Sequence, residues 1–298
     1  PALVLLGFFM IYPILWSLWM SFQVGRGMNL SFGGFANIMR LFQDPVFQRA
    51  LGNTFTFLIV QVPIMLVLAL IFATMLNDSK LWGRGIFRTA IFLPCVTSLV
   101  AYSVLFRSLF LADGFVNNTL MNLHLIAEPI PWLADPFWAK VVIIMAITWR
   151  WTGYNMIFYL AAMQNIDRSI YESARIDGVP SWARFWYLTV PMLKPVILFT
   201  SVISTIGTLQ LFDEVNNIPP NAGGPSDATL TLSLYIYNLS FRFMPSFGYA
   251  ATVSYVIVVL VGILSFLQFW VARDPKPKVP TSKTSGHKPA ATGEASAS

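Results

Sequence analysis

Charged side chains gather in one short stretch of an otherwise apolar chain. Residues 171–195 read YESARIDGVPSWARFWYLTVPMLKP, whereas only 11% of the 298 residues are charged. The charged members of this stretch are Glu172, Arg175, Asp177, Arg184 and Lys194. Such side chains either form ion pairs with a partner or only keep a loop in contact with water, and the residues alone leave both interpretations open.

The beginning of this stretch carries the signals of a short helix. Ser169 followed by Glu172 fits a capping box, in which each side chain satisfies a free amide of the first turn. Gly178 can adopt the left-handed conformation that ends a helix, and Pro180 prevents continuation. We therefore expect a helix of about two turns at residues 170–177. A protruding, preformed helix loses little entropy on binding and suits the docking of a partner.

Aromatic residues at helical spacing follow this predicted helix. The residues on that spacing are Trp182, Phe185, Trp186 and Thr189. Tryptophan-rich amphipathic helices tend to lie at the membrane surface. Pro191 and Pro195 are then expected to end this second helix and to start a membrane span.

Arg150 stands in the middle of another apolar run, TWRWTGYNMIF at residues 148–158. An ionisable group at membrane depth is costly and by default indicates a solute pathway. Trp151, Tyr154 and Asn155 accompany it, and a mixture of aromatic rings with amide and guanidinium donors suits a carbohydrate. The alternatives are that Arg150 pairs with a partner subunit or extends toward the membrane surface.

Residues that other function classes require are missing from the sequence. No G-x-x-x-x-G-K-[ST] loop occurs, so the chain cannot bind ATP by that route. The single Cys95 and the widely separated His124 and His287 argue against a disulfide framework and a metal site. Asp213 and Glu214 have no histidine near them in sequence, which argues against a membrane-bound transferase. We expect no catalysis, no metal and no cofactor in this chain.

Membrane spans must position these residues. The chain is 56% hydrophobic with a mean hydropathy of +0.65, and a helix needs roughly 20 apolar residues to cross a bilayer. Six segments qualify: residues 1–25, 50–77, 88–112, 136–166, 195–212 and 243–272. Residues 1–25 lack a clear cleavage site, and their apolar run is too long for the apolar core of a signal peptide. The sequence predicts an all-α, polytopic membrane protein with six transmembrane helices.

The distribution of Lys and Arg sets the expected orientation. With the amino end inside, twelve of these residues lie in inner segments and four lie in outer loops. Both termini are therefore expected in the cytoplasm, and the net charge of +6 needs no nucleic-acid partner. The tail at residues 274–298 is rich in Lys, Pro, Ser and Thr, and we expect it to be disordered in the cytoplasm.

The charged loop resembles a known coupling motif. ESARIDG, followed after nine residues by LTVP, is similar to the EAA loop of ABC importer permeases. The matching positions are Glu172, Ala174, Gly178 and Pro191, while Ser173, Leu188 and Val190 replace residues of similar size. Asp177 and Phe185 further resemble the carbohydrate-type permeases of the maltose-permease superfamily, larger-subunit type. The likeness covers almost all of the chain except the tail.

This resemblance implies a type I ABC importer transmembrane domain at residues 1–273, with its cytoplasmic EAA loop at about 165–194. It implies that the ATPase-coupling residues are Glu172, Ser173, Ala174, Asp177 and Gly178. It also implies a second homologous permease subunit, two ATP-binding subunits that hold ATP and Mg, and an extracytoplasmic solute-binding protein in a bacterial cytoplasmic membrane. A secondary transporter is less favoured, because Pro13 and Pro63 do not form paired broken spans.

The resemblance also implies a solute pathway. The pathway residues expected in or next to spans three to five are Ser98, Arg150, Trp151, Tyr154, Asn155, Gly207, Gln210 and Asp213. Alignment to the family's sugar site further implies Cys95, Leu99, Ile147 and Ile203. The expected solute is a carbohydrate, namely an oligosaccharide, and the alternative is glycerol phosphate or a glycerophosphodiester.

Overall fold

The computed structural model describes residues 1–27, 29–78 and 81–273. Five helical stretches in these residues are long and apolar enough to cross a membrane, and a bent pair of helices brings the total to six. The predicted all-α fold with six spans is therefore confirmed. The predicted tail at residues 274–298 lies outside the described residues.

The membrane-length stretches divide into the following elements. The first stretch comprises α1 (Ala2–Leu6), η1 (Gly7–Ile11) and α2 (Tyr12–Ser21), the second is α4 (Pro45–Asn77), and the third is the bent pair α5 (Arg84–Val96) and α6 (Leu99–Leu109). The fourth is α8 (Pro136–Gln164). The fifth comprises α10 (Ser181–Arg184), η2 (Phe185–Thr189), α11 (Val190–Leu209) and α12 (Asp213–Asn217), and the sixth is α14 (Phe247–Ala272). The connecting elements are β1 (Gln23–Arg26), β2 (Asn29–Phe32), α3 (Ala36–Gln43), α7 (Phe115–Asn122), α9 (Arg168–Ile176), η3 (Pro225–Asp227), α13 (Leu232–Tyr237) and η4 (Asn238–Arg242).

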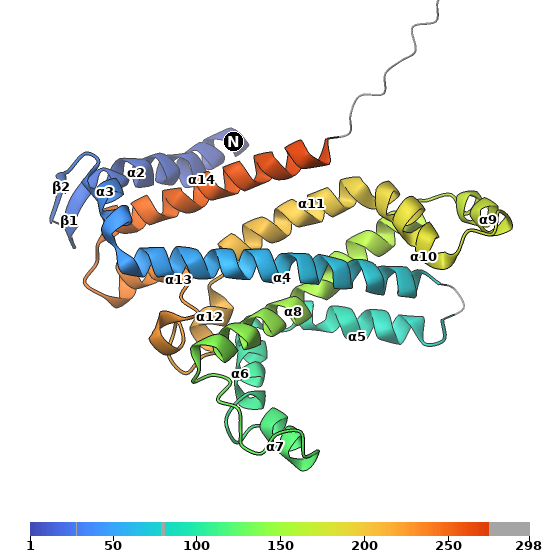
Figure 1. Cartoon of the computed structure of the whole chain (residues 1–298). Coiled ribbons are helices and arrows are strands. Elements are labelled where there is room, and N and C mark those ends of the chain that lie inside the picture. The colour runs from blue at the N-terminus through green and yellow to red at the C-terminus, as the bar shows by residue number, and fades with distance from the viewer. Residues whose placement is uncertain (28, 79–80, 274–298) are drawn as a thin grey trace, which may run out of the picture.

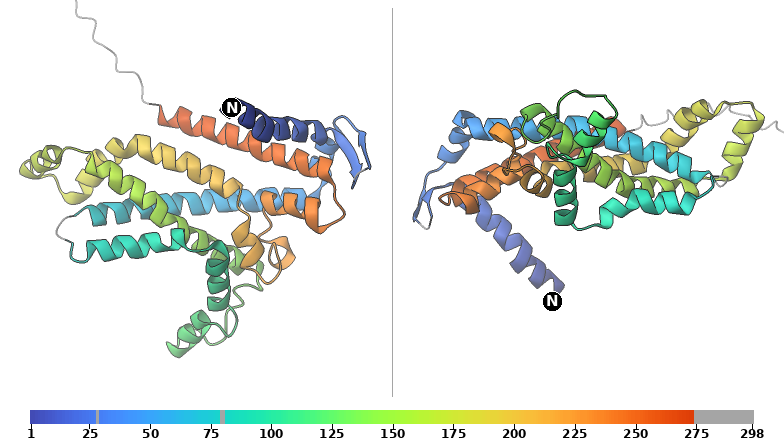
Figure 2. Two further views of the ribbon diagram at one scale, coloured as in Figure 1. Left: turned by 180° about the vertical axis from the view of Figure 1, so that it is seen from behind. Right: turned by 90° about the horizontal axis from the view of Figure 1, so that it is seen from below.

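Helices α4 and α8 form the centre of the bundle, with α5 beside α8 and α11 beside α4 (Figure 1). Helix α14 packs on α11, and the first helical stretch packs on the outer side of α14. The two further views show that α9 and α10 project from one end of the bundle, while the antiparallel β1–β2 hairpin lies at the other end (Figure 2). The cavity described below lies between these two ends.

Both central helices begin with the same local sequence, an aspartate followed by proline. Asp44 accepts the backbone N–H groups of Val46 and Phe47 at 2.9 and 3.3 Å. Asp135 accepts the two corresponding N–H groups at the start of α8. The aspartate satisfies free amides, and proline in the first turn removes an amide that would have no partner. These caps fix where α4 and α8 begin.

The apolar core is divided into two clusters along the bundle. One cluster, at the hairpin end, includes the fully buried Phe57 of α4 and Ile143 of α8. The other, toward α9, includes Ala69 of α4 and Tyr159 of α8. Small residues such as Ala69 let helices approach closely, which is how helices pack inside membranes. Gln61 of α4 and Asn155 of α8 lie between the two clusters along their helices.

Two predicted span boundaries are wrong. The first span ends at Ser21 instead of residue 25, because the chain turns there into the β1–β2 hairpin. Gly25 and Gly27 adopt positive φ angles of 139° and 59° in this hairpin, which favours glycine. The second span begins at Pro45 and not at residue 50, because Asp44 provides the cap.

The third span is broken, contrary to the single span predicted at residues 88–112. Helices α5 and α6 meet at 102°, with Thr97 and Ser98 extended between them. The hydroxyl of Thr97 donates to the carbonyl of Pro94 at 2.8 Å. This bond satisfies one of the carbonyls left free when α5 ends. No glycine marks the break, so the sequence pattern alone indicated one continuous helix.

The fifth span is longer than predicted. Pro191 and Pro195 were expected to separate it from the aromatic helix, yet α10, η2 and α11 form one continuous helical run. Pro191 lies in the first turn of α11, and the π-helical turn η2 precedes it. A π turn changes the hydrogen-bond register, and membrane helices tolerate proline where neighbouring groups satisfy the freed backbone.

Candidate solute cavity and coupling helix

A cavity of about 520 Å³ lies in the middle of the bundle. Helices α4, α6, α8, α11 and α12 and the segment between α11 and α12 contribute its lining. The predicted pathway residues that line it are Trp151, Tyr154, Asn155, Gly207, Gln210 and Asp213. Leu99, Ile147 and Ile203, expected from the alignment to the family's sugar site, line it as well. Residues from spans three, four and five therefore share one cavity.

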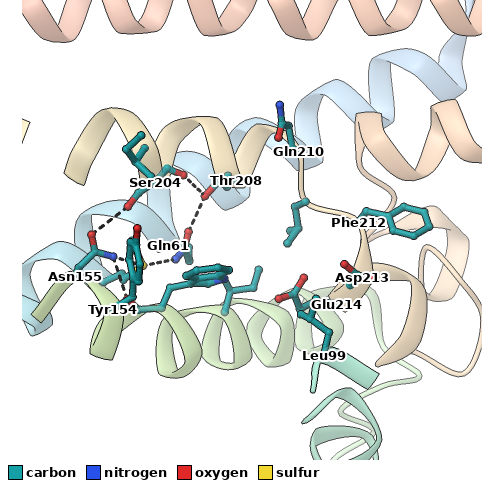
Figure 3. A pocket seen from close by; sticks show the side chains of 16 residues that line it. Gln61, Leu99, Tyr154, Asn155, Ser204, Thr208, Gln210, Phe212, Asp213 and Glu214 are labelled. Carbon is teal, nitrogen blue, oxygen red and sulfur yellow. Dashed lines mark hydrogen bonds between the residues drawn. The ribbon is translucent and has the colours of Figure 1, made fainter. Parts of the chain in front are cut away.

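A polar network crosses the floor of the cavity and joins three helices (Figure 3). Thr208 of α11 donates to the amide oxygen of Gln61 of α4 at 3.1 Å. Ser204 of α11 donates to the amide oxygen of Asn155 of α8 at 3.4 Å. The amide nitrogens of Gln61 and Asn155 both point to the sulfur of Met65, at 3.1 and 3.6 Å. The Asn155 amide nitrogen also donates to a backbone carbonyl of α8 at 3.0 Å, so its contact to sulfur, like that of Gln61, is the weak one that a hydroxylated solute can replace.

Aromatic rings form one wall of the cavity. The ring of Trp151 is 37% exposed, and its centroid lies 5.8 Å from that of Tyr154 in an edge-to-face arrangement. Tyr154 in turn meets Phe158 at 5.0 Å. Such packing holds the rings in fixed orientations at low entropic cost. A preformed aromatic wall beside amide groups suits a ligand with both apolar and hydroxylated faces.

Two carboxylates lie at one end of the cavity. Asp213 and Glu214 begin α12 and line the cavity beside Leu99 (Figure 3). Glu214 is only 4% exposed. Within the described part of the chain, no lysine, arginine or histidine belongs to the cavity lining. The lining therefore offers acidic groups and no cation that would pair with an anionic solute.

Like Cys95 of the sugar-site alignment, the predicted pathway residues Arg150 and Ser98 do not line the cavity. Arg150 is buried, and its Nη2 donates to the backbone carbonyl oxygens of Thr97 at 3.1 Å and Cys95 at 3.4 Å. Ser98 is one of the extended residues between α5 and α6. Both residues belong to the break in the third span, so the structure groups them together but places them beside the cavity.

The sequence interpretation missed several lining residues, above all Gln61 and Ser204. Gln61 is 1% exposed and stands in the middle of α4, a run that is otherwise almost entirely apolar. A lone amide at mid-span is a signal that the sequence alone carried. Ser204 gave no such signal, because serine in membrane helices is common as a packing residue.

The predicted loop helix forms, but its amino-terminal cap is different. Asp167, not Ser169, precedes α9, and its carboxylate accepts the Ser169 N–H at 2.9 Å. The predicted capping box is therefore wrong, because aspartate two residues earlier supplies a stronger, charged acceptor. Hydrogen bonds from the backbone and side chain of Ser169 hold the pKa of the Asp167 carboxyl below its ordinary value.

The carboxyl-terminal end of α9 follows the prediction. Gly178 adopts a φ of +72°, and its N–H bonds to the carbonyl oxygen of Arg175 at 3.1 Å. The N–H of Val179 reaches back to the carbonyl oxygen of Ala174 at 3.0 Å. This reversal is typical of a helix that ends in a left-handed glycine. It fixes the length of α9.

Four of the five predicted coupling residues lie on the surface of this helix. The exposed ones are Glu172, Ser173, Asp177 and Gly178, whereas Ala174 is buried against the chain. Tyr171 ties α9 to the membrane helix that follows, because its hydroxyl lies 3.1 Å from that of Thr189. This contact joins α9 to the helical run that continues as α11.

Comparisons with known proteins agree on the kind of chain this is. A family model described as "Binding-protein-dependent transport system inner membrane component" matches residues 30–277. The chain is 69% identical over 276 residues to the lactose transport system permease protein LacF of Rhizobium radiobacter, covering 93% of each. It is 33% identical over 261 residues to the arabinooligosaccharides transport system permease protein AraP of Halalkalibacterium halodurans, covering 87% of this chain and 81% of that protein.

Solved structures share the fold. The crystal structure of a bacterial ABC transporter involved in the import of the acidic polysaccharide alginate matches with a TM-score of 0.80 at 25% identity, covering 92% of each chain. The alginate transporter in complex with its alginate pentasaccharide-bound periplasmic protein matches with a TM-score of 0.79 at 23% identity, covering 92% of this chain and 91% of that chain.

Proposed function

Because this chain belongs to the family of binding-protein-dependent transport system inner membrane components, we propose that it is a permease subunit of an ATP-driven importer for a neutral oligosaccharide. The solute class follows from the cavity. The aromatic rings of Trp151 and Tyr154 share the cavity with amide and hydroxyl groups, a combination that suits a sugar ring. The names of the lactose and arabinooligosaccharide relatives support this assignment.

The acidic residues in the cavity lining are the observation that favours a neutral sugar over the phosphorylated alternatives. Asp213 and Glu214 place carboxylates on the cavity wall, and the described lining holds no cation to balance a phosphate. Taking an anion into a site that holds acidic side chains and no cation costs free energy that the binding energy must offset. Glycerol phosphate and glycerophosphodiesters are therefore disfavoured as solutes.

Helix α9 is the proposed docking point for the ATPase. Glu172, Ser173, Asp177 and Gly178 present an exposed, charged surface on a capped helix that the Tyr171–Thr189 contact links to α11. This chain holds no phosphate-binding loop, so ATP and Mg are expected on two partner ATPase subunits. Catalysis then belongs to the partners, and this chain transmits their motion to the cavity.

The remaining partners follow from the same scheme. A second homologous permease subunit would complete the pathway. In the first helical stretch no residue before Ser21 is buried, so the stretch offers apolar surface to that subunit or to lipid. With both termini in the cytoplasm, the end that carries α9 faces the ATPases and the hairpin end faces an extracytoplasmic binding protein. ATP favours one of two states, and that preference shifts the population between inward and outward access.

Stimulation of ATP hydrolysis by solute tests the proposed solute class. The complete transporter is reconstituted in lipid, and ATP hydrolysis is measured with the binding protein and either lactose or glycerol phosphate. We expect lactose to raise the rate and glycerol phosphate to leave it at the level without solute. Stimulation by glycerol phosphate alone would contradict the proposal of a neutral sugar.

A further inference from the structure

The break in the third span raises a physical problem that Arg150 resolves. Helix α5 ends at Val96 in the middle of the apolar pair α5–α6, which turns by 102°. A helix that ends leaves carbonyl oxygens without intrahelical partners, and no water replaces them at membrane depth. Some other group must satisfy these carbonyls for the break to be stable.

Arg150 of α8 is that group. Its side chain is 5% exposed, and Nη2 donates to the carbonyl oxygens of Thr97 and Cys95 at 3.1 and 3.4 Å. Its guanidinium carbon also lies 5.0 Å from the ring centroid of Tyr102, which belongs to α6. The cation thus contacts the end of α5 and the first turn of α6 together. A positive charge at the carboxyl end of a helix is also favoured by the helix dipole.

A glycine on the same face of α8 reinforces this contact. A Cβ atom at Gly153 would overlap the carbonyl oxygen of Ile91 in α5, so the two backbones touch there. Gly153 follows Arg150 by three residues, which places both on one side of α8. Helix α8 therefore holds α5 at two adjacent points, by close packing at Gly153 and by hydrogen bonds at Arg150.

The position of the break determines part of the cavity wall. Leu99 is the first residue of α6 and lines the cavity, and α6 packs against α12, which carries Asp213 and Glu214. We propose that Arg150 is a positioning residue that fixes the α5–α6 break and thereby the shape of this wall, without contacting the solute. Its effect on transport rests on the proposed function, whereas its effect on the break does not.

The chain's single cysteine reports on the break directly. Cys95 accepts one of the Arg150 hydrogen bonds through its carbonyl, and its side chain is partly exposed. The rate of maleimide labelling of Cys95 is measured in the assembled transporter for the wild type, Arg150→Ala and Arg150→Lys. We expect Arg150→Ala to label several-fold faster and Arg150→Lys to fall between the two. Loss of a nearby cation alone would slow thiolate chemistry, so faster labelling reports opening of the break.

A second readout separates positioning from solute contact and from mere stability. The ratio of uptake rates for a disaccharide and a trisaccharide is measured with one binding protein, so a changed ratio arises in the permease. We expect Arg150→Ala to change this ratio together with the labelling rate. Lys140→Ala, which removes a cation from the same helix about three turns away, serves as the control and should change neither.

Each other outcome overturns the inference. An unchanged labelling rate with a changed ratio of uptake rates would show that Arg150 contacts the solute. Faster labelling with an unchanged ratio of uptake rates would show that Arg150 stabilises the break without shaping the cavity. Unchanged values in both assays would remove any role at the break. If Arg150→Ala does not assemble, the same criteria apply to Arg150→Lys. Failure of the wild-type transporter to import either sugar would refute the proposed function, while the labelling comparison would still test the contact with the break.

Discussion

Single residues of the predicted pathway fall into two groups, those that line the cavity and those that stabilise the backbone beside it. Tyr154 and Trp151 line the cavity, whereas Arg150 bonds to backbone carbonyls beside it. The sequence indicated this cluster around Arg150 as a solute pathway because polar residues in membrane spans indicate function. That principle cannot tell a ligand contact from a backbone contact, because the break that Arg150 stabilises is visible only in three dimensions.

Tyr154 provides the most direct test of the aromatic wall. Tyr154→Ala removes the ring that packs against Trp151 and Phe158, and we expect it to lower the catalytic efficiency of uptake roughly tenfold or more, about 1–3 kcal/mol. Tyr154→Phe keeps the ring and is expected to retain most of the transport. Initial rates of labelled sugar uptake check both variants. Equal loss in both would indicate that the hydroxyl, and not the ring face, matters.

Glu172 tests the docking surface of α9. Glu172→Lys reverses an exposed charge, and we expect it to abolish uptake while the chain still inserts and assembles with its partner permease. Glu128→Lys makes the same change at an exposed position outside α9 and should retain uptake. Co-purification of the ATPase and sugar uptake are the two measurements. Normal co-purification and uptake in Glu172→Lys would remove α9 from the coupling path.

Among the helices, caps and close contacts determine where each span begins, ends and bends. The apolar runs, the loop helix and its glycine stop were predictable, because each follows from local sequence. The continuous helix through Pro191 and the bend after Val96 were not, because η2 and the Arg150 contact override the usual effects of proline and of an unbroken apolar run. The cavity could not be predicted from local sequence, because it depends on the packing of α4, which brings Gln61 beside Thr208.

Asp44 links the start of α4 to two tyrosines and predicts a pH dependence. Burial raises the pKa of its carboxyl, but hydrogen bonds from the hydroxyls of Tyr235 and Tyr249 and from two backbone amides outweigh it, so the pKa is lowered overall. A lowered pKa in the folded state contributes stability that is present above the unfolded value of about 3.9 and lost as the pH falls through the folded value.

Asp44→Ala should therefore lower stability at neutral pH and reduce its acid dependence. The lost helix cap alone costs about 1–2 kcal/mol. The Tm of the purified transporter is measured from pH 6 downward for the wild type and Asp44→Ala, and we expect the difference to shrink at the acidic end. A difference that stays constant through the acidic range would show that the carboxylate charge does not stabilise the fold.

Gly153 tests the close approach of α5 and α8. Gly153→Val places side-chain atoms where the Ile91 carbonyl lies, so we expect α5 to separate from α8 and the yield of assembled transporter to fall sharply. Gly262→Val in α14 adds the same atoms where no atom lies within 4 Å and should assemble normally. Size-exclusion chromatography of the detergent-solubilised complex measures both. Normal assembly of Gly153→Val would contradict the packing of these helices.

At the scale of the whole molecule, the bundle connects two separated sites. The exposed helix α9 lies at one end, the cavity lies at the centre, and α11 runs from the Tyr171–Thr189 contact to the polar network at Ser204 and Thr208. The family and the arrangement of spans followed from the sequence, since the loop motif and the apolar runs extend over most of the chain. The carbohydrate class of the solute also followed from the sequence, whereas the preference for a neutral over a phosphorylated solute depends on which side chains line the cavity.

Uptake of labelled lactose into proteoliposomes tests the central claim most directly. The vesicles contain this chain with its partner permease and ATPase subunits, and the binding protein is supplied on the opposite side from ATP. We expect uptake that requires both ATP and the binding protein and that does not respond to a proton or sodium gradient. Uptake by this chain without an ATPase, driven by an ion gradient, would contradict it.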